Sequence, residues 1–409
     1  MMLNKTINIG ILGGGTAGAV NLVALLYHIR SPEFVRQQVK IKLTCIHDPK
    51  IPVTQVGESV TPTVCFTLLD ALKFNILQDL PPIDGTLRFG ARYFWDKQNG
   101  QTFDIPFTSP GLHVNSEKFS YKVIDMALKE FPNVIDLKLD RVLNYTQDKD
   151  SVTVFCENET FNFDYIIDCM GTPSKEELAG ELYTTPDIET VNSVMLYPDF
   201  TETHEIYTSS YVHDNGWMFG VPLTHRKAYG YLYNRDITSH EEAGRHFAEL
   251  KGIDTEPLRK ISWKHYYRKK VIDRRVLTSG NRLYFFEPHM TLPLHFYNMI
   301  GLDFLTKIVK TQNDVGRINS EMNKGYADAM DKIQDLIALN YAGECRIKSP
   351  FWEETNEKAK QRLRDSDRWQ HWLKTSENTI QGFFIHPQRV MSEYINGYKI
   401  DLKELKRKE

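Results

Sequence analysis

The stretch INIGILGGGTAG, from Ile7 to Gly18, decides which fold the N-terminal part of the chain can adopt. INIGIL is a short, β-branched run typical of a strand that is buried on both faces. AVNLVALLYHI, which begins at Ala19, has the length and the apolar face of a helix. GGGTAG lies between the two, so the GxGxxG pattern stands in the strand–turn–helix context of a dinucleotide-binding βαβ unit. The sequence therefore predicts an α/β fold with a Rossmann-like core.

Each residue of this turn has its own physical role in the prediction. Gly13 allows the tight turn, Gly15 lets a pyrophosphate approach the backbone, and Gly18 lets helix and strand pack closely. Thr16 and Ala17 open the helix, whose unpaired N–H groups attract an anion. A glycine-rich loop that binds nothing is the alternative, and the flanking strand and helix disfavour it.

A second strand is expected in VKIKLTCIHD, residues 39–48. In the dinucleotide fold, an acidic residue at the C-terminal end of this strand receives the ribose hydroxyls. His47 and Asp48 occupy that end, and either side chain can accept the bond. The connection from Gly18 is longer than in a minimal βαβ unit, because SPEFVRQQ is inserted as a loop. This length favours FAD over a nicotinamide cofactor.

A third buried strand is predicted in ETFNFDYIIDCMG, residues 159–171, where a hairpin strand feeds a strand that ends at Asp168. Gly171 follows closely and leaves the backbone open to a ligand. A strand followed by an ordinary turn is the alternative. Because this segment accompanies GxGxxG, we interpret Asp168 and Gly171 as a second nucleotide contact.

The composition of the 409-residue chain, 41% hydrophobic and 12% aromatic, supports a large globular core. Its net charge of −3 leaves no basic stripe, so nucleic acid is not an expected partner. The five cysteines lack CxxC or Cys/His spacing, which predicts no metal site and favours reduced thiols in a cytoplasmic protein. The apolar stretch Ile7–Tyr27 carries glycines and polar residues, so we expect no membrane span and no signal peptide. A homo-oligomer is compatible with this composition.

Six segments of the chain stand out together: GGGTAG, VGESVTPT (Val56–Thr63), DCMG (Asp168–Gly171), GWMFGVPL (Gly216–Leu223), FFEPHMTLPL (Phe285–Leu294) and SPFWEE (Ser349–Glu354). In this order they resemble segments of the flavin-dependent tryptophan halogenase family. The resemblance implies an FAD-binding fold of the flavin monooxygenase type with mixed sheets. It further implies an FAD-binding domain at residues 1–300 with a substrate-facing sheet, and a mainly helical portion at residues 301–409.

The family resemblance also implies a chemistry. Family enzymes use reduced FAD, delivered by a separate NAD(P)H-dependent flavin reductase, together with oxygen and a halide to make hypohalous acid. The acid reaches a small aromatic substrate, such as an indole, phenol or pyrrole, through a short tunnel. Further FAD contacts implied by the resemblance are a strap of Gly57, Glu58 and Ser59, and the positions Gly280 and Pro288; the implied halide contacts are Thr291 and Leu292.

GWMFGVPL is similar to the WxWxIP motif with which the family keeps substrate away from the flavin. Trp217 and Pro222 match the motif, whereas Phe219 replaces its second tryptophan. Tyr93 is placed in the same tunnel wall. The alternative is a core strand with alternating side chains, which explains the aromatic residues but not the glycines and the proline.

Two departures from the family pattern concern the chemistry. A family lysine at the tunnel end lies in a segment similar to DGTLRFGARYFW, and Arg88 takes its place here. A guanidinium stays protonated, so we expect no haloamine at this position and a retained hydrogen-bonding role. Met290 takes the place of a glutamate that polarises the oxidant, and the neighbouring His289 is a candidate acid or base.

These departures leave three functions open for the chain. The first is halogenation of an electron-rich aromatic molecule by an FAD-dependent enzyme. The second is hydroxylation on the same scaffold, since Arg88 and Met290 depart from the halogenase pattern. The third is a flavin binder without catalysis, which the intact GGGTAG turn disfavours because such a protein has no need for a pyrophosphate site.

Overall fold

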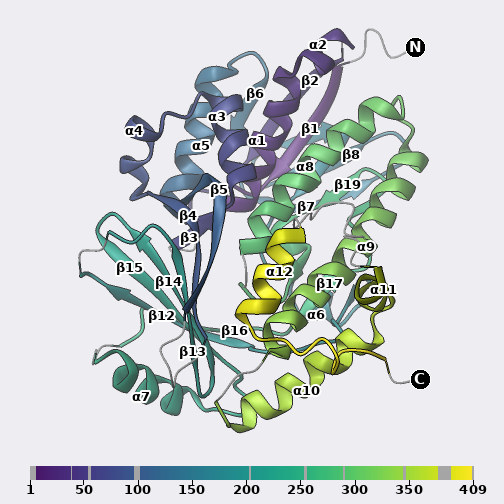
Figure 1. The fold of residues 1–409 in the computed structure, drawn as a ribbon. Helices are drawn as coiled ribbons and strands as arrows, with labels where there is room; N and C mark the ends of the chain where they lie inside the picture. Colours follow the sequence, from purple (N-terminus) through teal and green to yellow (C-terminus); the bar gives the residue numbers. More distant parts are fainter. Residues whose placement is uncertain are drawn as a thin grey trace.

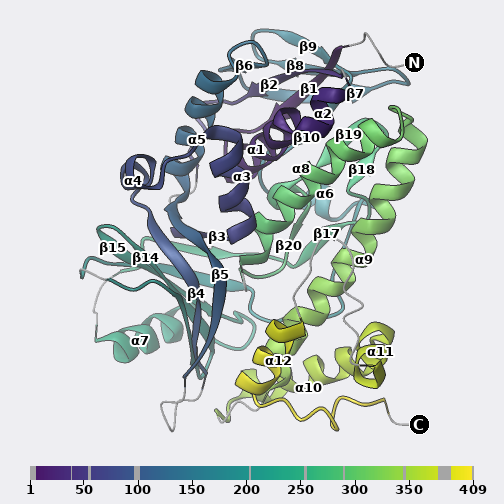
Figure 2. The ribbon, with the colours of Figure 1, turned by 45° about the horizontal axis from the view of Figure 1, so that its top comes forward.

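The computed structural model describes residues 6–37, 39–53, 57–95, 102–201, 204–252, 256–288, 291–343, 347–375 and 388–407. Two large sheets lie towards opposite ends of the molecule, and the long helix α9 (Val315–Ala342) runs past both of them (Figure 1, Figure 2). The expected α/β fold with several sheets and a mainly helical C-terminal portion is confirmed.

A six-stranded, mainly parallel sheet forms around the strand that INIGIL predicts. Ile7, Ile9 and Ile11 are buried because this strand, β1, pairs in parallel with β2 on one side and β10 on the other. β18 runs antiparallel at one edge. In spatial order the strands are β18 (Ile272–Asp273), β19 (Val276–Thr278), β10 (Tyr165–Asp168), β1 (Thr6–Leu12), β2 (Lys40–Ile46) and β6 (Ile135–Lys138).

The helix after GGGTAG, α1 (Thr16–Arg30), is buried almost all round. Every residue from Gly18 to Leu26 is buried, as expected for a helix enclosed by protein on all sides. The helices that pack against α1 are α3 (Pro62–Leu72), α5 (Ser116–Glu130) and α8 (Leu292–Lys310).

The insertion SPEFVRQQ, predicted to be a loop, contains the short helix α2 (Pro32–Arg36). Ser31 caps this helix by accepting a hydrogen bond from the Phe34 backbone N–H at 3.2 Å, and Pro32 takes the first helical position. Both are local helix-start signals that the loop prediction overlooked.

The second large sheet has eight strands and curls over one of its own faces. A Cβ built on Gly57, in the edge strand β3, would lie 3.0 Å from Ala228 Cβ and 3.2 Å from Val221 Cγ1, although three strands separate β3 from β14 in the sheet order. In spatial order the strands are β16 (Arg259–Ser262), β12 (Ser193–Asp199), β15 (Arg226–Tyr233), β14 (Gly216–Leu223), β13 (Thr208–His213), β4 (Thr86–Phe94), β5 (Thr102–Asn115) and β3 (Gly57–Val60).

The two faces of this sheet have different neighbours. Met218 and Tyr231 point to the face covered by α7 (His240–Lys251), where they pack with Phe247. Trp217 points to the opposite face, because side chains alternate along a strand. There its Nε1–H donates to the hydroxyl of Tyr341 on α9 at 2.9 Å. GWMFGVPL is therefore a strand, β14, whose tryptophan faces the helical C-terminal portion.

Smaller elements connect these parts. They are α4 (Ile76–Asp79), α6 (Lys175–Leu178), the 3₁₀ helices Pro81–Ile83 and Gly280–Arg282, an antiparallel sheet of β7 (Val142–Gln147), β8 (Val152–Cys156) and β9 (Thr160–Phe163), and a second one of β11 (Tyr183–Thr184), β17 (Tyr266–Arg268) and β20 (Tyr284–Phe285).

The C-terminal helices pack on both large sheets. The expected domain boundary between residues 300 and 301 falls inside α8, so the division of the chain remains a prediction. Across the described ranges, no helix combines the length and the apolar character needed to cross a membrane. After α9 the helices are α10 (Pro350–Asp365), α11 (Asp367–Thr375) and α12 (Gln388–Gly397).

Candidate functional site

The GGGTAG turn joins β1 to α1 with the backbone that each glycine permits. Gly13 has a φ of 107°, and a Cβ there would meet the Cys169 carbonyl oxygen at 2.7 Å. A Cβ on Gly18 would lie 2.1 Å from the Gly13 carbonyl oxygen, whereas a Cβ on Gly15 would meet nothing within 4 Å. Gly13 and Gly18 are thus required by the fold, and Gly15 borders open space in front of the helix N-terminus.

Other predicted cofactor positions lie around this turn. Burial raises the pKa of Glu58, in the strap, to about 7. A hydrogen bond with the Thr16 side chain limits this rise. Gly280, with a φ of 69°, would place a Cβ 2.7 Å from Ala17 Cβ. A Cβ on Gly171 would meet nothing within 4 Å. The structure brings these positions to the carboxyl ends of β1 and β10, where α/β sheets bind ligands.

The residues present at this turn fit FAD. His47 Nε2 and Glu58 Oε2 are buried and have no hydrogen-bond partner among the described residues, so both are ready for a polar ligand. Gly15 leaves room for a pyrophosphate beside the N–H groups of α1. His47 is better placed than Asp48, whose carboxylate accepts the Lys50 backbone N–H at 2.8 Å in a local turn.

Asp168 is buried at the end of β10, and its carboxylate is already engaged. It accepts hydrogen bonds from the Tyr145 hydroxyl at 3.0 Å, Arg282 Nε at 3.2 Å and the Met170 backbone N–H at 3.1 Å. The backbone after it, up to Gly171, is the part of this segment that remains open to a cofactor.

A hydrogen-bond chain joins the strap to the wall strand. Ser59 Oγ lies 3.0 Å from Thr208 Oγ1, which lies 2.9 Å from His113 Nε2. His113 Nδ1 lies 3.1 Å from Thr86 Oγ1, and Thr86 donates to the Pro222 carbonyl at 2.8 Å.

The donor and the acceptor of each hydrogen bond in this series can be assigned from its last member, because the Pro222 carbonyl can only accept. Thr86 uses its proton there and accepts from His113 Nδ1–H, so a neutral His113 accepts at Nε2 from Thr208. Burial and the nearby Arg88 and Lys227 hold the His113 pKa well below its usual value, which keeps the ring neutral. This series of hydrogen bonds therefore holds the strap in a fixed position relative to β14, and we call it the His113 clamp.

Arg88 lies on β4 next to this clamp and is 2% exposed. Its Nε donates to the Gly90 carbonyl at 3.3 Å, and its guanidinium stands 4.7 Å from the Phe107 ring centroid. Its Nη1 is buried without a partner among the described residues. The phenols of Tyr93 and Tyr394 are its electrostatic neighbours, and burial lowers the Arg88 pKa to about 10. The guanidinium thus stays charged at neutral pH and offers an unused donor.

Three of the predicted wall residues, Tyr93, Trp217 and Phe219, share one face of the sheet, since Tyr93 and Phe219 both lie opposite the same residue of β13. The fourth, Pro222, has the parity of Met218 and belongs to the other face. The Trp217 and Phe219 rings lie 6.4 Å apart, and the Phe219 ring covers Gly230 of the neighbouring strand, where a Cβ would meet it at 2.1 Å. Behind Trp217, the Tyr341 hydroxyl donates to Glu287 Oε2 at 2.8 Å, and Thr190 donates to the same oxygen. Glu287 Oε1 is buried without a partner among the described residues.

Glu287→Gln is expected to remove a pH dependence of stability. Burial raises the Glu287 pKa from 4.5 to about 7 in the folded protein. Below pH 4.5 the carboxyl is protonated in both states and costs nothing. As pH rises towards 7, only the unfolded state ionises freely, so the folded protein loses about 3 kcal/mol of unfolding free energy. Urea titrations at pH 5 and 8 measure this loss; an equal loss in the glutamine variant would contradict the assignment.

The predicted halide residues lie at the N-terminus of α8. Thr291 has a φ of 61°, a rare conformation for this residue type, and Leu292 opens the helix. Among the described residues, no side chain caps the first turn of α8, so its backbone N–H groups, apart from Pro293, which has none, remain for an anion. Thr61, just after the strap, contacts His295 Nδ1 at 3.3 Å and links the strap to this helix. His289 and Met290 lie outside the described residues, and Pro288 is the last described residue before them.

A groove of about 190 Å³ opens beside the wall. Gly57 of the strap, Phe219 and Ala228 line its apolar side, and Arg226 and Arg259 line its rim. The groove therefore connects the strap with the wall strand and with solvent-facing cations.

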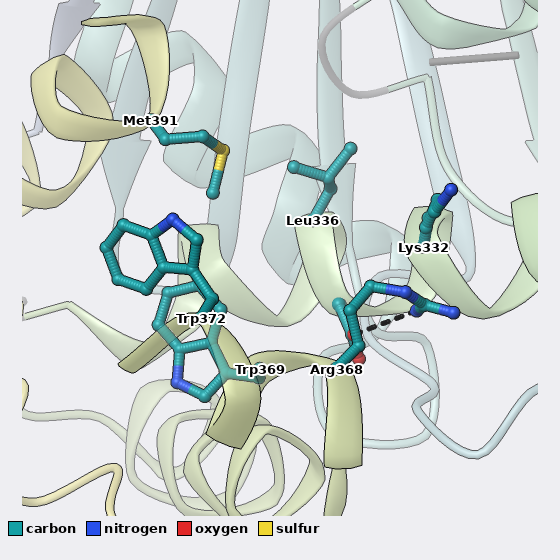
Figure 3. A pocket seen from close by; sticks show the side chains of 7 residues that line it. Lys332, Leu336, Arg368, Trp369, Trp372 and Met391 are labelled. Atoms are coloured by element: carbon teal, nitrogen blue, oxygen red, sulfur yellow. Dashed lines mark hydrogen bonds and ion pairs between the residues drawn. The ribbon is translucent and has the colours of Figure 1, made fainter. Parts of the chain in front are cut away.

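A second cavity, of about 20 Å³, lies between α9, α11 and α12 (Figure 3). Trp369 and Trp372 stack there with centroids 5.0 Å apart, close to Met391. Carboxylates of α9 neutralise the adjacent Lys332 and Arg368. This volume holds about one water molecule, so in this conformation the cavity is not a substrate site.

Several residues of the site were not predicted from sequence. Most of them come from segments far from the motifs, and nothing in their local sequence distinguishes them from core residues. Glu287 is the exception, because it lies inside the segment FFEPHMTLPL. Within the described residues, no group of three or more His, Cys, Asp or Glu side chains is arranged for a metal, and Cys45, Cys65, Cys156 and Cys169 are buried free thiols. The residues missed are His113, Thr190, Thr208, Glu287, Tyr341 and Tyr394.

Comparisons with known proteins identify relatives of this chain. The sequence profile described as "Tryptophan halogenase" matches residues 8–143 and 109–383. Tryptophan 6-halogenase SttH of Streptomyces toxytricini is 26% identical over 185 residues, covering 42% of this chain and 34% of that protein. Tryptophan 7-halogenase RebH of Lentzea aerocolonigenes is 24% identical over 155 residues, covering 37% and 29%. The matched segments thus span about a third of these relatives.

Solved structures match nearly the whole chain. A tryptophan halogenase from Shewanella frigidimarina NCIMB 400 superposes with a TM-score of 0.81 at 17% identity, covering 98% of this chain and 90% of that one. BrvH, a flavin-dependent halogenase from Brevundimonas sp. BAL3, gives 0.79 at 17% identity, covering 97% and 90%. At these identities the likeness shows a shared fold.

Proposed function

The chain belongs to the tryptophan halogenase family, and we propose that it is an FAD-dependent halogenase acting on a small, electron-rich aromatic molecule. One observation carries the proposal: Arg88 is buried, charged and has an unused Nη1 among the described residues. A buried guanidinium nitrogen without an acceptor is costly. Such a cost is typical of a group kept for a ligand, and the family resemblance puts the oxidant at this position.

Arg88 has the properties that activation of hypohalous acid requires. Its Nη1–H donates a hydrogen bond to the acid's oxygen and draws electron density from the O–X bond, so the halogen becomes more electrophilic. The low-dielectric surroundings strengthen this effect. A guanidinium cannot form a haloamine while it is protonated, so the route proposed is donation alone.

Bound at the GGGTAG turn, reduced FAD would supply the electrons with which oxygen and halide form hypohalous acid. The backbone at Gly15 and the N–H groups of α1 would hold the pyrophosphate, and His47 would meet the ribose. The strap clamped by His113 would hold the ring side of the cofactor. The N-terminus of α8, at Thr291 and Leu292, would hold the halide. A separate NAD(P)H-dependent flavin reductase is the partner that this scheme requires.

A second function, hydroxylation, is favoured by the groove beside the wall. Its open space reaches both the strap and Phe219, where the family motif carries a second tryptophan. A small aromatic molecule in this groove would lie near the strap, and oxygen transfer would then compete with halogen transfer.

A mass-spectrometric screen distinguishes the two functions. The protein is incubated with FAD, a flavin reductase, NADH, oxygen and bromide or chloride, over a panel of indoles, phenols and pyrroles. A halide-dependent halogen mass shift is the expected result. A shift of one oxygen that is indifferent to halide would replace halogenation by hydroxylation. An Arg88→Met variant serves as the control for adventitious chemistry of free reduced flavin.

A further inference from the structure

The groove beside the wall has an apolar floor that the rest of the protein leaves partly uncovered. Cross-strand partners share one face of a sheet, and Phe219 pairs with Gly230, which pairs with Leu196. The opposite face of these strands is covered by α7 (Figure 1). The floor residues all line the groove of about 190 Å³ and are all partly exposed; they are Leu196, Pro198, Phe219 and Ala228.

Two arginines stand on the same face of the sheet as this floor. Arg259 is the cross-strand partner of Leu196, and Arg226 precedes Ala228 by two residues, so both side chains share the face of the floor. Both arginines line the groove. Neither side chain forms a hydrogen bond or an ion pair with a described residue, and none of the described residues that line the groove is Asp or Glu. The groove therefore combines an apolar floor with positive charge that no lining carboxylate neutralises.

This combination is complementary to a small aromatic acid. A guanidinium forms two parallel hydrogen bonds with a carboxylate, and an aromatic ring covers an apolar floor. The groove volume of about 190 Å³ lies below the roughly 300–1,000 Å³ of sites for drug-sized ligands, so a molecule of one or two rings fits. An ammonium group would find no carboxylate side chain in this lining, which favours an acid without an amine over an aromatic amino acid.

The groove also reaches the residues assigned to the reaction. Gly57 of the strap lines it, and one row of cross-strand partners joins it to the predicted tunnel wall. In order across the sheet, this row is Arg259, Leu196, Gly230, Phe219, Ser210 and Tyr93.

We propose that the groove binds small aromatic acids through Arg226 and Arg259, and that such acids are the acceptors of this enzyme. The acceptor role rests on the proposed function, whose substrate class it narrows to aromatic anions without an amine. The binding site itself stands on the groove and its two arginines.

The test compares indole-3-propionate with indole-3-propionamide, which has the same shape but no charge. Equilibrium dialysis measures their binding to the full chain loaded with FAD. We expect the acid to bind roughly tenfold more tightly than the amide and than tryptophan. Arg226→Gln and Arg259→Gln should each weaken binding of the acid roughly tenfold and leave the amide within about twofold. In turnover of the acid, both variants should raise KM by the same factor and leave kcat within about twofold.

Arg235→Gln is the matched control for these variants. Arg235 is exposed in the turn after β15 and does not line the groove, so its loss removes the same charge and should leave binding of both indoles unchanged. Arg259 is exposed and Arg226 is half-buried, so neither test substitution removes a core side chain.

The outcomes separate this inference from the proposed function. Equal affinity for acid and amide, or acid binding that is unchanged in both arginine variants, would overturn the inference; halogenation of neutral indoles would then leave the proposed function standing. Loss of FAD affinity with unchanged binding of the acid would assign the groove to the cofactor and would also overturn the inference. Arginine-dependent binding without a halogenated product from any indole would overturn the proposed function and the acceptor role, and would leave the binding site standing.

Discussion

Arg88→Met is expected to lower the rate of halogenation by roughly 100- to 1,000-fold and, at the same time, to stabilise the fold. The rate falls because a preorganised donor to the oxidant is lost, and one such donor is worth about 3–4 kcal/mol of transition-state energy. The free energy of unfolding rises by roughly 1–4 kcal/mol, because an apolar side chain of similar length replaces a buried cation whose Nη1 has no acceptor among the described residues. Steady-state product formation and urea denaturation measure the two effects.

A matched control for Arg88→Met lies four residues further along the same strand. Arg92 forms a two-bond ion pair with Asp104, both at 2.8 Å, and its side chain is 44% exposed. Arg92→Met should leave turnover within about twofold and change stability by less than about 1 kcal/mol. If Arg88→Met instead destabilises the protein and spares turnover, Arg88 is a structural residue and the proposed function loses its main support.

Arg88→Lys tests which property of the side chain matters. A lysine keeps a donor but ends nearer the backbone and deprotonates more easily when buried. Turnover near that of the unaltered protein would mean that donation alone suffices. A loss as large as in the methionine variant would mean that the reach or the geometry of the guanidinium is required.

The cofactor turn could be predicted from sequence because its requirements are local. Gly18 is required by a contact within this turn and Gly13 by its own φ of 107°, so the order of glycines carries most of the information; only the Cys169 carbonyl oxygen beside Gly13 comes from another part of the chain. Asp168 was placed correctly at the end of its strand for the same reason. The hydrogen bonds that the Asp168 carboxylate accepts were not predictable, because the donors Tyr145 and Arg282 come from other elements.

The surroundings of Arg88 on β4 depend on long-range packing, and the sequence reveals only part of them. A family resemblance points to Arg88, but Tyr394 meets Tyr93 of the same strand from a helix about 300 positions later in the chain. His113 likewise acts through partners on two other strands, Thr86 on β4 and Thr208 on β13. Contacts of this kind arise from the curl of the eight-stranded sheet and the docking of α12, which no local periodicity encodes.

Gly18→Ala is expected to destabilise the fold and abolish FAD binding. Its Cβ would stand 2.1 Å from the Gly13 carbonyl oxygen, and backbone cannot rotate away as a side chain can. Separating α1 from the turn should cost about 3 kcal/mol of unfolding free energy and displace the N–H groups that face the pyrophosphate. Urea denaturation of the apoprotein and fluorescence titration with FAD measure the two losses.

Gly15→Ala distinguishes the effect of this turn on protein stability from its effect on FAD binding. A Cβ at Gly15 meets nothing within 4 Å, and its φ of −80° suits alanine, so the apoprotein should keep its stability within about 0.5 kcal/mol. The methyl group would nevertheless fill the space through which a pyrophosphate approaches, and FAD affinity should fall at least tenfold. Gly244→Ala, inside α7 with its nearest atom at 3.8 Å, controls for the glycine-to-alanine change itself. If Gly15→Ala binds FAD normally, the open space before α1 is not the pyrophosphate site, and the cofactor assignment fails although the fold stands.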